Sequence, residues 1–308
     1  SNTSGGFHGV AGMEPQYHHY YDWITIANLR IEGGDMTVLD APINLQAKSD
    51  HWRIINNEIF NWAAADGRRR DVKGKVIREA RAGGIVGNGS DIAILGNHIH
   101  HIDGGTQNHC IYLDTGATDV EIAYNHIHHC NGGNIIQTFD NLGMGALKNI
   151  QIHHNLMHDG SRYGLNLSNG TDSAIAWNNV IYNTAFAGVR LSVAGSTDAE
   201  IHVVHNTLYN NNTVNGGDGR APIVNSWNLT QRPVFVKNNI IYSGPFSTSY
   251  YTNYGSGSAV LDRNLYFGLS IGGVPQQDAN PVGGSDLNNP IFSNPGSGDF
   301  HLQAGSPS

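Results

Sequence analysis

The sequence predicts an all-β solenoid, a single-stranded parallel β-helix of about nine coils. Two observations predict this fold: an unusual composition and a recurring phrase. Only 14% of the 308 residues are charged and 39 are glycine, which argues against long surface helices and against a charge-driven disordered chain. The phrase consists of alternating apolar residues, an Asn, and then a His or Tyr, as in IAILGNHIHH from Ile92 and IHVVHNTLYN from Ile201.

The spacing of the phrase gives the coil length. Most copies lie 24 to 30 residues apart, which is typical of one coil of a parallel β-helix. Apolar alternation indicates strands, because strand side chains repeat every two residues. With coils stacked about 4.8 Å apart, the Asn side chains would form a hydrogen-bonded ladder. Asn also tolerates the left-handed backbone of a sharp turn. The ladder residues are Asn57, Asn97, Asn125, Asn155, Asn179, Asn206, Asn239 and Asn264, with Asn28 as a candidate earlier member.

A third strand in each coil follows a Gly-rich turn, as in HCIYLD from His109 and YGLNLS from Tyr163. The alternation directs one set of side chains inward and the other outward. The expected inward residues are Ile111, Leu113, Leu165, Leu167, Val189 and Leu191. The expected outward residues are Tyr112, Asn166 and Arg190.

We expect one domain over residues 1–308, because no linker divides the chain. Residues 1–20 would cap the open end of the stack, which otherwise exposes unpaired strand edges. The charged segment 63–84 would leave the stack as a loop or short helix, and residues 270–308 would form an irregular tail. Two cysteines, Cys110 and Cys130, could form one disulfide or remain buried thiols.

Charge and hydropathy exclude several partners. The net charge of −8 provides no basic field for nucleic acid. No apolar run approaches the ~20 residues of a membrane span. The start Ser-Asn-Thr-Ser-Gly-Gly lacks Met, which is consistent with a removed leader and with a secreted or cell-surface protein. The sequence predicts no particular oligomeric state.

The recurring phrase resembles that of the right-handed parallel β-helix, or pectate-lyase-like, superfamily. The resemblance rests on copies such as NNVIYN from Asn178 and covers about residues 20–270. The tail DFHLQAGSPS from Asp299 is similar to the closing motif of many such proteins. The resemblance implies a right-handed coil that binds polysaccharide along a strand face. It implies no single reaction, because fold does not determine function.

The outward row on the Gly-rich strands is the candidate active site. A solvated polar face is the alternative, but this row combines acid, base and amide groups more densely than the flanking coils. It contains Tyr112, Asp114, Gln137, Asn166, Ser168, Arg190 and Ser192, with His109, Arg162 and Tyr163 at the strand entries.

Two cleavage reactions fit this row. Elimination from a uronate polysaccharide needs a base, a cation on the carboxylate and a proton donor. His109 or Tyr112 could be the base, and Arg162 and Arg190 could grip the carboxylate. No cofactor is required, although Ca²⁺ could replace an Arg. Hydrolysis needs two carboxylates instead, and Asp114 with Asp140 is the candidate pair. A non-catalytic polysaccharide-binding or adhesive protein is the third alternative.

Three histidines each follow a ladder Asn by three residues: His100, His128 and His158. Ring stacking on one strand explains them most simply, because Phe and Tyr occupy the same slot in other coils. His128, His129 and His158 could also bind sugar. A metal site formed by His100, His128 and His158 is a further alternative.

Overall fold

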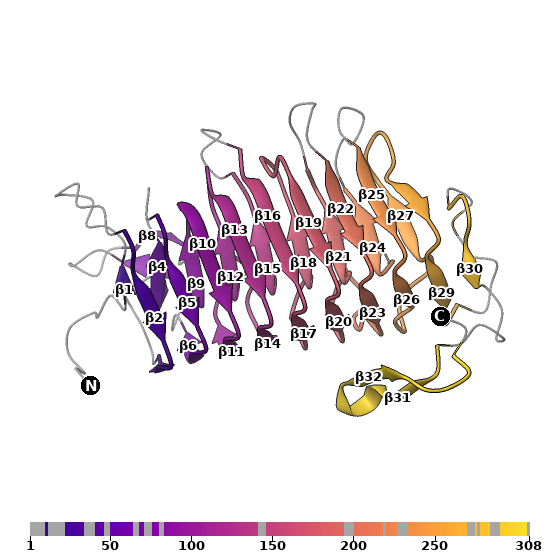
Figure 1. The fold of residues 1–308 in the computed structure, drawn as a ribbon, viewed down its shortest axis with the longest axis horizontal. Helices are drawn as coiled ribbons and strands as arrows, with labels where there is room; N and C mark the ends of the chain where they lie inside the picture. The colour runs from indigo at the N-terminus through magenta and orange to yellow at the C-terminus, as the bar shows by residue number, and fades with distance from the viewer. Residues whose placement is uncertain are drawn as a thin grey trace.

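The computed structural model describes residues 10–11, 22–33, 41–45, 50–63, 68–70, 76–79, 83–140, 146–193, 200–217, 220–226, 233–269, 275, 278–283 and 290–306. Over these residues the chain winds through three long parallel sheets, visiting each sheet once per coil (Figure 1). The sheets contain nine, nine and ten strands, in agreement with the about nine coils expected. No helix in this part of the chain is long and apolar enough to cross a membrane.

Sheet 1 is formed by the strands that follow the Gly-rich turns, and it carries the candidate site. Its strands are β1 (Val10–Ala11), β4 (Ile43–Leu45), β9 (Ile85–Gly87), β12 (Ile111–Leu113), β15 (Ile136–Thr138), β18 (Leu165–Leu167), β21 (Val189–Leu191), β24 (Ile223–Asn225) and β27 (Tyr251–Asn253). The pairing of β1 with β4 means that residues 10–11 extend this sheet at its N-terminal end.

Sheets 2 and 3 are formed by the two halves of the recurring phrase, before and after the Asn. Sheet 2 consists of β2 (Thr25–Ala27), β5 (Arg53–Ile55), β10 (Ser90–Leu95), β13 (Thr118–Ala123), β16 (Lys148–His153), β19 (Ala174–Trp177), β22 (Ile201–Val204), β25 (Val234–Lys237) and β28 (Val260–Asp262). Sheet 3 consists of β3 (Arg30–Glu32), β6 (Glu58–Ala63), β11 (His98–Asp103), β14 (His126–Cys130), β17 (Leu156–His158), β20 (Val180–Tyr182), β23 (Thr207–Tyr209), β26 (Ile240–Tyr242), β29 (Leu265–Phe267) and β30 (Val282–Gly283).

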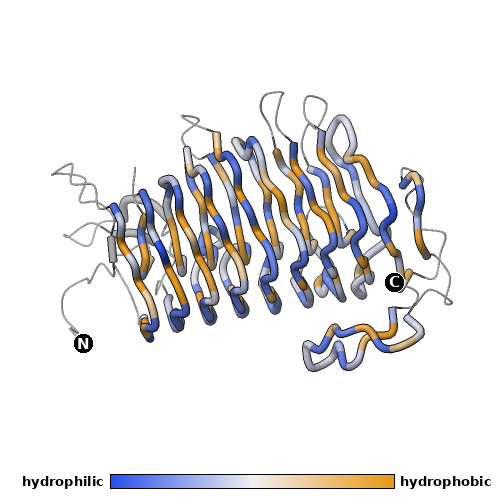
Figure 2. Tube along the Cα trace, in the orientation of Figure 1, coloured by the Kyte–Doolittle hydropathy of each residue, from blue (hydrophilic) through white to orange (hydrophobic). Residues whose placement is uncertain are grey.

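The core is a set of aliphatic columns inside the coil. In sheet 1, Ile111 pairs with Ile85 on one side and Ile136 on the other, and all three are fully buried. Hydrophobic and hydrophilic residues alternate along many strands of the stack (Figure 2). Burying one such side chain contributes about 1.5–3 kcal/mol, so the columns supply much of the driving force for stacking. The six residues predicted to point inward are all fully buried.

The predicted Asn ladder is confirmed over eight coils, from Asn57 to Asn264. Each Nδ2 donates to Oδ1 of the next Asn at 2.9 to 3.0 Å. The ladder ends on a carboxylate: Asn264 Nδ2 and the Tyr266 hydroxyl donate to Asp278 Oδ2 at 2.9 and 2.8 Å. A carboxylate accepts without needing an acceptor in return, so Asp278 terminates the row.

Two expectations about the ladder are wrong by one residue. Asn28 is not a ladder member, because Leu29 occupies that position and donates its backbone N–H to Asn57 Oδ1 at 3.0 Å. The left-handed backbone also lies one residue before the ladder position, as at Asn28 and Asn56, whose φ angles are 56° and 53°. The ladder Asn is therefore selected by its hydrogen bonds, and the preceding residue makes the turn.

Two segments outside the three sheets form antiparallel pairs. Within the charged insertion, β7 (Arg68–Arg70) pairs with β8 (Val76–Glu79), so the described part is a hairpin where a loop or short helix was expected. In the C-terminal tail, β31 (Phe292–Asn294) pairs with β32 (Asp299–Leu302) around a 3₁₀ turn, η2 (Pro295–Ser297). This hairpin packs Phe300 against Tyr182 and Tyr209, at ring distances of 5.0 and 5.3 Å.

The two cysteines form a disulfide, Cys110–Cys130, with a Cα–Cα distance of 5.8 Å. The bond joins the entry of β12 to the end of β14, and both residues are fully buried. Reduction should lower the free energy of unfolding by about 2–4 kcal/mol, because the unfolded chain loses a cross-link. Urea unfolding of oxidised and reduced protein measures this difference. An unchanged midpoint after thiol titration has shown complete reduction would contradict the expectation.

Candidate functional site

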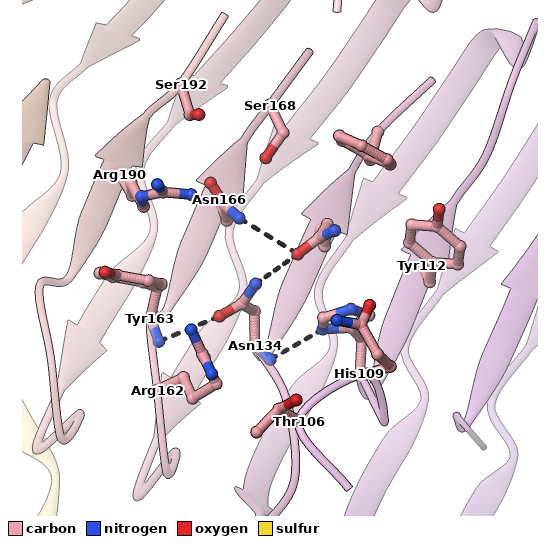
Figure 3. Close-up of a pocket in the computed structure, with 13 residues that line it drawn as sticks. Thr106, His109, Tyr112, Asn134, Arg162, Tyr163, Asn166, Ser168, Arg190 and Ser192 are labelled. Atoms are coloured by element: carbon pink, nitrogen blue, oxygen red, sulfur yellow. Dashed lines mark hydrogen bonds between the residues drawn. The ribbon is translucent and has the colours of Figure 1, made fainter. Parts of the chain in front are cut away.

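A groove of about 490 Å³ crosses the outer face of β12, β15, β18 and β21 (Figure 3). It lies on the outward row that the sequence singled out. Among the described residues, its lining is entirely polar or aromatic and contains no acidic residue: Thr106, Gln107, His109, Tyr112, Asn134, Gln137, Phe139, Arg162, Tyr163, Asn166, Ser168, Arg190 and Ser192.

The structure brings most of the predicted active-site row into this groove. His109, Tyr112, Gln137, Arg162, Tyr163, Asn166 and Arg190 all line it. The parallel register explains the assembly, since Gln137 pairs with Tyr112 on one side and with Asn166 on the other. Tyr112 and Asn166 do point out of the core as predicted, yet they are only 6% and 3% exposed because they pack within the groove wall.

The two candidate carboxylates for hydrolysis are not part of the lining. Asp114 and Asp140 lie beyond the strand ends, where Thr115 connects them. The Thr115 hydroxyl lies 2.8 Å from Asp140 Oδ1 and 3.1 Å from Asp114 Oδ1. The backbone N–H of Thr115 also donates to Asp114 at 2.7 Å. These contacts assign both carboxylates to the turns after β12 and β15.

Amide side chains connect neighbouring coils along the groove floor. Asn134 Oδ1 accepts from the backbone N–H of Tyr163 at 3.2 Å, and Asn134 Nδ2 donates to Gln137 Oε1. Asn166 Nδ2 donates to the same oxygen at 3.1 Å. This network, drawn in Figure 3, holds the polar floor in one arrangement. Preorganised groups of this kind stabilise developing charge without reorganising.

His109 is held by the neighbouring coil through its Nδ1 atom, which accepts from the backbone N–H of Asn134 at 2.8 Å. The neutral ring therefore carries its proton on Nε2. The close approach depends on Gly133, because a Cβ at that position would lie 2.4 Å from His109 Nδ1. The resulting geometry makes Nε2 a proton donor, whereas the sequence left open its use as a base.

Two arginines flank one aromatic ring in the groove. The guanidinium carbon of Arg190 lies 5.2 Å from the centre of the Tyr163 ring, and that of Arg162 lies 6.0 Å from it. Arg162 also lies 5.6 Å from the Phe186 ring. These contacts orient both cations beside the groove. With no acidic residue in the lining, the site has a positive charge within a chain of net charge −8.

Four lining residues were not identified as site residues from the sequence: Thr106, Gln107, Asn134 and Phe139. Asn134 could have been found, because it lies two residues before Ile136 as His109 lies before Ile111 and Tyr163 before Leu165. Thr106 and Gln107 belong to the turn that leads into β12, where the repeat gives no alignment.

The histidine ladder lies on sheet 3, and none of its rings lines the groove. The expected ring stack is present. His100 stacks on His128 at 5.1 Å and His128 on His158 at 4.9 Å, with Phe60 and Tyr182 continuing the column at either end. His128, His129 and His158, which could bind sugar, therefore lie on sheet 3, outside the groove lined by Gln137, Tyr163 and Asn166.

Comparison with protein families agrees with this architecture. The family described as "Right handed beta helix region" matches residues 20–207 and 83–266. The chain belongs to this family. The handedness implied by the sequence resemblance is thereby confirmed. No curated protein sequence matches the chain.

Two solved structures share the right-handed β-helix fold with this chain. One is the A-module of the mannuronan C-5 epimerase AlgE4 from Azotobacter vinelandii, at 16% identity and a TM-score of 0.55, covering 88% of this chain and 67% of that one. The other is the Dettilon tailspike protein, at 13% identity and a TM-score of 0.52, covering 86% of this chain and 60% of that one. At these identities the similarity shows the fold alone.

Burial of the β-helix histidines suppresses their protonation. Burial first, and then the His158, His98 and His100 rings, lower the pKa of His126 to about 4. Burial, followed by the imidazoles of His126, His158, His129 and His100, lowers the pKa of His128 to about 2. Both rings are therefore neutral in the folded protein at pH 5 to 7.

Acid should destabilise the folded β-helix through His126 and His128. In the unfolded chain, His has a pKa near 6.5. Below that pH the unfolded chain therefore binds protons at these positions, whereas His126 and His128 remain neutral in the folded chain. The contribution of these two histidines to the free energy of unfolding is fully present above pH about 6.5. It falls by roughly 2 kcal/mol, with allowance for solvent screening, as the pH falls toward 4. Melting curves between pH 7.5 and 4.5, recorded with a chelator, measure the loss.

The variant His128→Tyr measures how much of the acid sensitivity comes from the stacked histidines of sheet 3. His128→Tyr should fold, because Tyr182 occupies the same column two coils away. The variant should lose less stability than wild type between pH 7.5 and 4.5. Equal losses in both proteins would assign the acid sensitivity to groups outside the ladder.

Proposed function

We propose that this protein cleaves a uronate-containing polysaccharide by β-elimination in the sheet 1 groove. The observation that carries the proposal is the combination of Arg162 and Arg190 with a lining free of acidic residues. Such a surface attracts a polyanion and gives its carboxylates guanidinium partners. The groove crosses three inter-strand steps from β12 to β21, or about 14 Å, which suits several sugar units of a chain laid across the strands.

The groove also supplies the acid–base groups. We assign Tyr112 as the base that removes the proton beside the carboxylate. We assign His109 Nε2–H, which is buried in the substrate-free groove, as the donor that would protonate the departing glycosidic oxygen once bound substrate displaces the groove wall. The C–H electron pair becomes the new carbon–carbon double bond while the carbon–oxygen bond breaks. The two rings lie 5.3 Å apart between centres, so they can act on adjacent atoms of one sugar.

The arginines take separate roles in this assignment. Arg162 lies on the His109 side of Tyr163 (Figure 3) and would hold the carboxylate of the reacting sugar, where negative charge develops. Arg190, one coil further on, would hold the carboxylate of a neighbouring unit. Calcium does not suit the groove, because its lining offers no carboxylate oxygens.

Hydrolysis is the weaker alternative, because Asp114 and Asp140 lie outside the lining. Epimerisation is a closer alternative. It begins with removal of the same proton, and the structural neighbour from A. vinelandii is named as a mannuronan C-5 epimerase. The Cys110–Cys130 disulfide supports our proposal that the protein acts outside the cytosol, in an oxidising compartment.

A panel of acidic and neutral polysaccharides tests the proposal. Each reaction is followed by ultraviolet absorbance for unsaturated ends and by a reducing-end assay, with NMR of the polymer. Both signals together are expected from a uronate polymer. Reducing ends without absorbance would replace elimination by hydrolysis, and altered sugar configuration at constant chain length would replace it by epimerisation. Retention on a polymer without any change in it would indicate a binding protein.

A further inference from the structure

The outer face of sheet 3 carries a cluster of imidazoles that the proposed function does not use. The cluster lies on β11 and β14 and on the end of β17. The parallel register builds it, by aligning His98 with His126 and His100 with His128 and His158. Its members are His98, His100, His101, His126, His128, His129 and His158.

Diagonal contacts within the cluster bring ring nitrogens together. His98 Nε2 lies 2.9 Å from His128 Nε2, and His126 Nε2 lies 2.8 Å from His158 Nε2. A neutral pair at this distance shares one N–H proton between two nitrogens. A metal ion that replaces this proton would meet two nitrogens already directed at one point.

A third ligand lies beside the first pair. Single nitrogen atoms of His98, His126 and His128 all lie within 4.8 Å of one another. Zinc binds His nitrogen at about 2.0–2.1 Å in tetrahedral geometry, so small ring rotations would close the three around an ion. His128 is already oriented, because its Nδ1 contacts His129 Nδ1 at 2.6 Å and leaves Nε2 as the ligand atom.

In the described part of the chain, the C-terminal hairpin covers the aromatic part of this column and leaves the imidazoles half-buried. The β31–β32 hairpin packs Phe300 on Tyr182 and Tyr209, over β20 and β23 (Figure 1). His98, His126 and His128, on the preceding coils, are half-buried. An ion and its remaining water ligand could therefore reach them from solvent.

We propose that His98, His126 and His128 form a site for a divalent transition-metal ion of the zinc class. Three imidazole nitrogens suit Zn²⁺, Co²⁺ or Ni²⁺, whereas Ca²⁺ and Mg²⁺ need oxygen ligands. The site joins β11 to β14 and leaves a fourth position for water. This ligand set replaces the His100, His128, His158 alternative considered from the sequence. The nitrogens of His98, His126 and His128 lie within 4.8 Å of one another, whereas the His128 ring stacks between His100 and His158.

Titration of untagged, chelator-treated protein tests the site. Calorimetry with Zn²⁺ and visible absorption with Co²⁺ should each show one equivalent bound, and Zn²⁺ should raise the melting temperature by several degrees. Ca²⁺ and Mg²⁺ should produce no binding signal. Binding of no transition metal, or of several weak equivalents without a Co²⁺ absorption change, would overturn the proposal.

Variants identify the ligands. His98→Gln and His126→Gln should each weaken Zn²⁺ binding at least ~100-fold, with metal-free melting showing that each variant is folded. His205→Asn, an exposed histidine on another coil with φ of 56°, is the matched control and should bind as wild type does. A second nitrogen and oxygen set, Glu58, His98 and His100, also lies within 4.8 Å. Loss of binding in His100→Gln with full binding in His126→Gln would overturn the assigned ligands.

Discussion

Replacing Arg162 by Ala should reduce kcat/KM on the cleaved uronate polymer by about 100-fold or more, mainly through kcat. The reason is that Arg162 would stabilise charge that develops only in the transition state, and removal of one such donor typically costs a factor of about 10²–10³. Arg190→Ala should instead act mainly by raising KM, since it would hold a neighbouring sugar in ground state and transition state alike.

Neither substitution should change the melting temperature by more than about 3 °C, because both side chains lie outside the aliphatic columns. Arg220→Ala, at an exposed arginine outside the groove lining, is the matched control and should retain wild-type kinetics. Wild-type turnover in an Arg162→Ala, Arg190→Ala double variant would show that the active site lies on another face.

Among single substitutions at the centre of the Asn ladder, Asn179→Ala should be the most destabilising. Asn179 Oδ1 accepts from the backbone N–H and the Nδ2 of Asn155 at 3.1 and 2.9 Å, and its own Nδ2 donates to Ile152 O at 2.9 Å. The substitution leaves these buried partners unsatisfied, at a cost of about 3–5 kcal/mol. The melting temperature should fall by more than about 6 °C.

The adjacent Asn178 provides the control for this prediction. It is exposed and has a φ of 51°, a conformation that Gly adopts without strain. Asn178→Gly should therefore melt within about 3 °C of wild type. Similar melting of the two variants would mean that the ladder contributes little to stability.

The fold was predictable because each coil repeats the same physical pattern. The alternation of Ile111 and Leu113 with Tyr112 specifies which face is buried, and the spacing of the Asn residues specifies where each coil turns. Asp278 could not be found in this way, because it ends the ladder from a coil without the phrase. The disulfide was also open, since the sequence does not give the distance between Cys110 and Cys130.

The candidate site was only partly predictable, because register brings outward residues together but does not give their hydrogen bonds. Tyr112, Gln137 and Asn166 were found by register alone. Asp114 and Asp140 looked equivalent to them in the sequence, yet the turn at Thr115 holds both. The contacts between histidine nitrogens on sheet 3 depend on how each ring is rotated. The sequence therefore indicated the stacked rings but not the His98–His128 and His126–His158 contacts.

The most direct test of the central claim compares one uronate polymer with its carboxyl-reduced, neutral counterpart. Purified protein is incubated with each polymer, and unsaturated ends are measured by ultraviolet absorbance over time. The account predicts unsaturated product from the uronate polymer and none from the reduced one, because the base, the proton donor and Arg162 all act on a sugar that bears a carboxylate. Cleavage of the neutral polymer at a comparable rate, detected as new reducing ends, would contradict it.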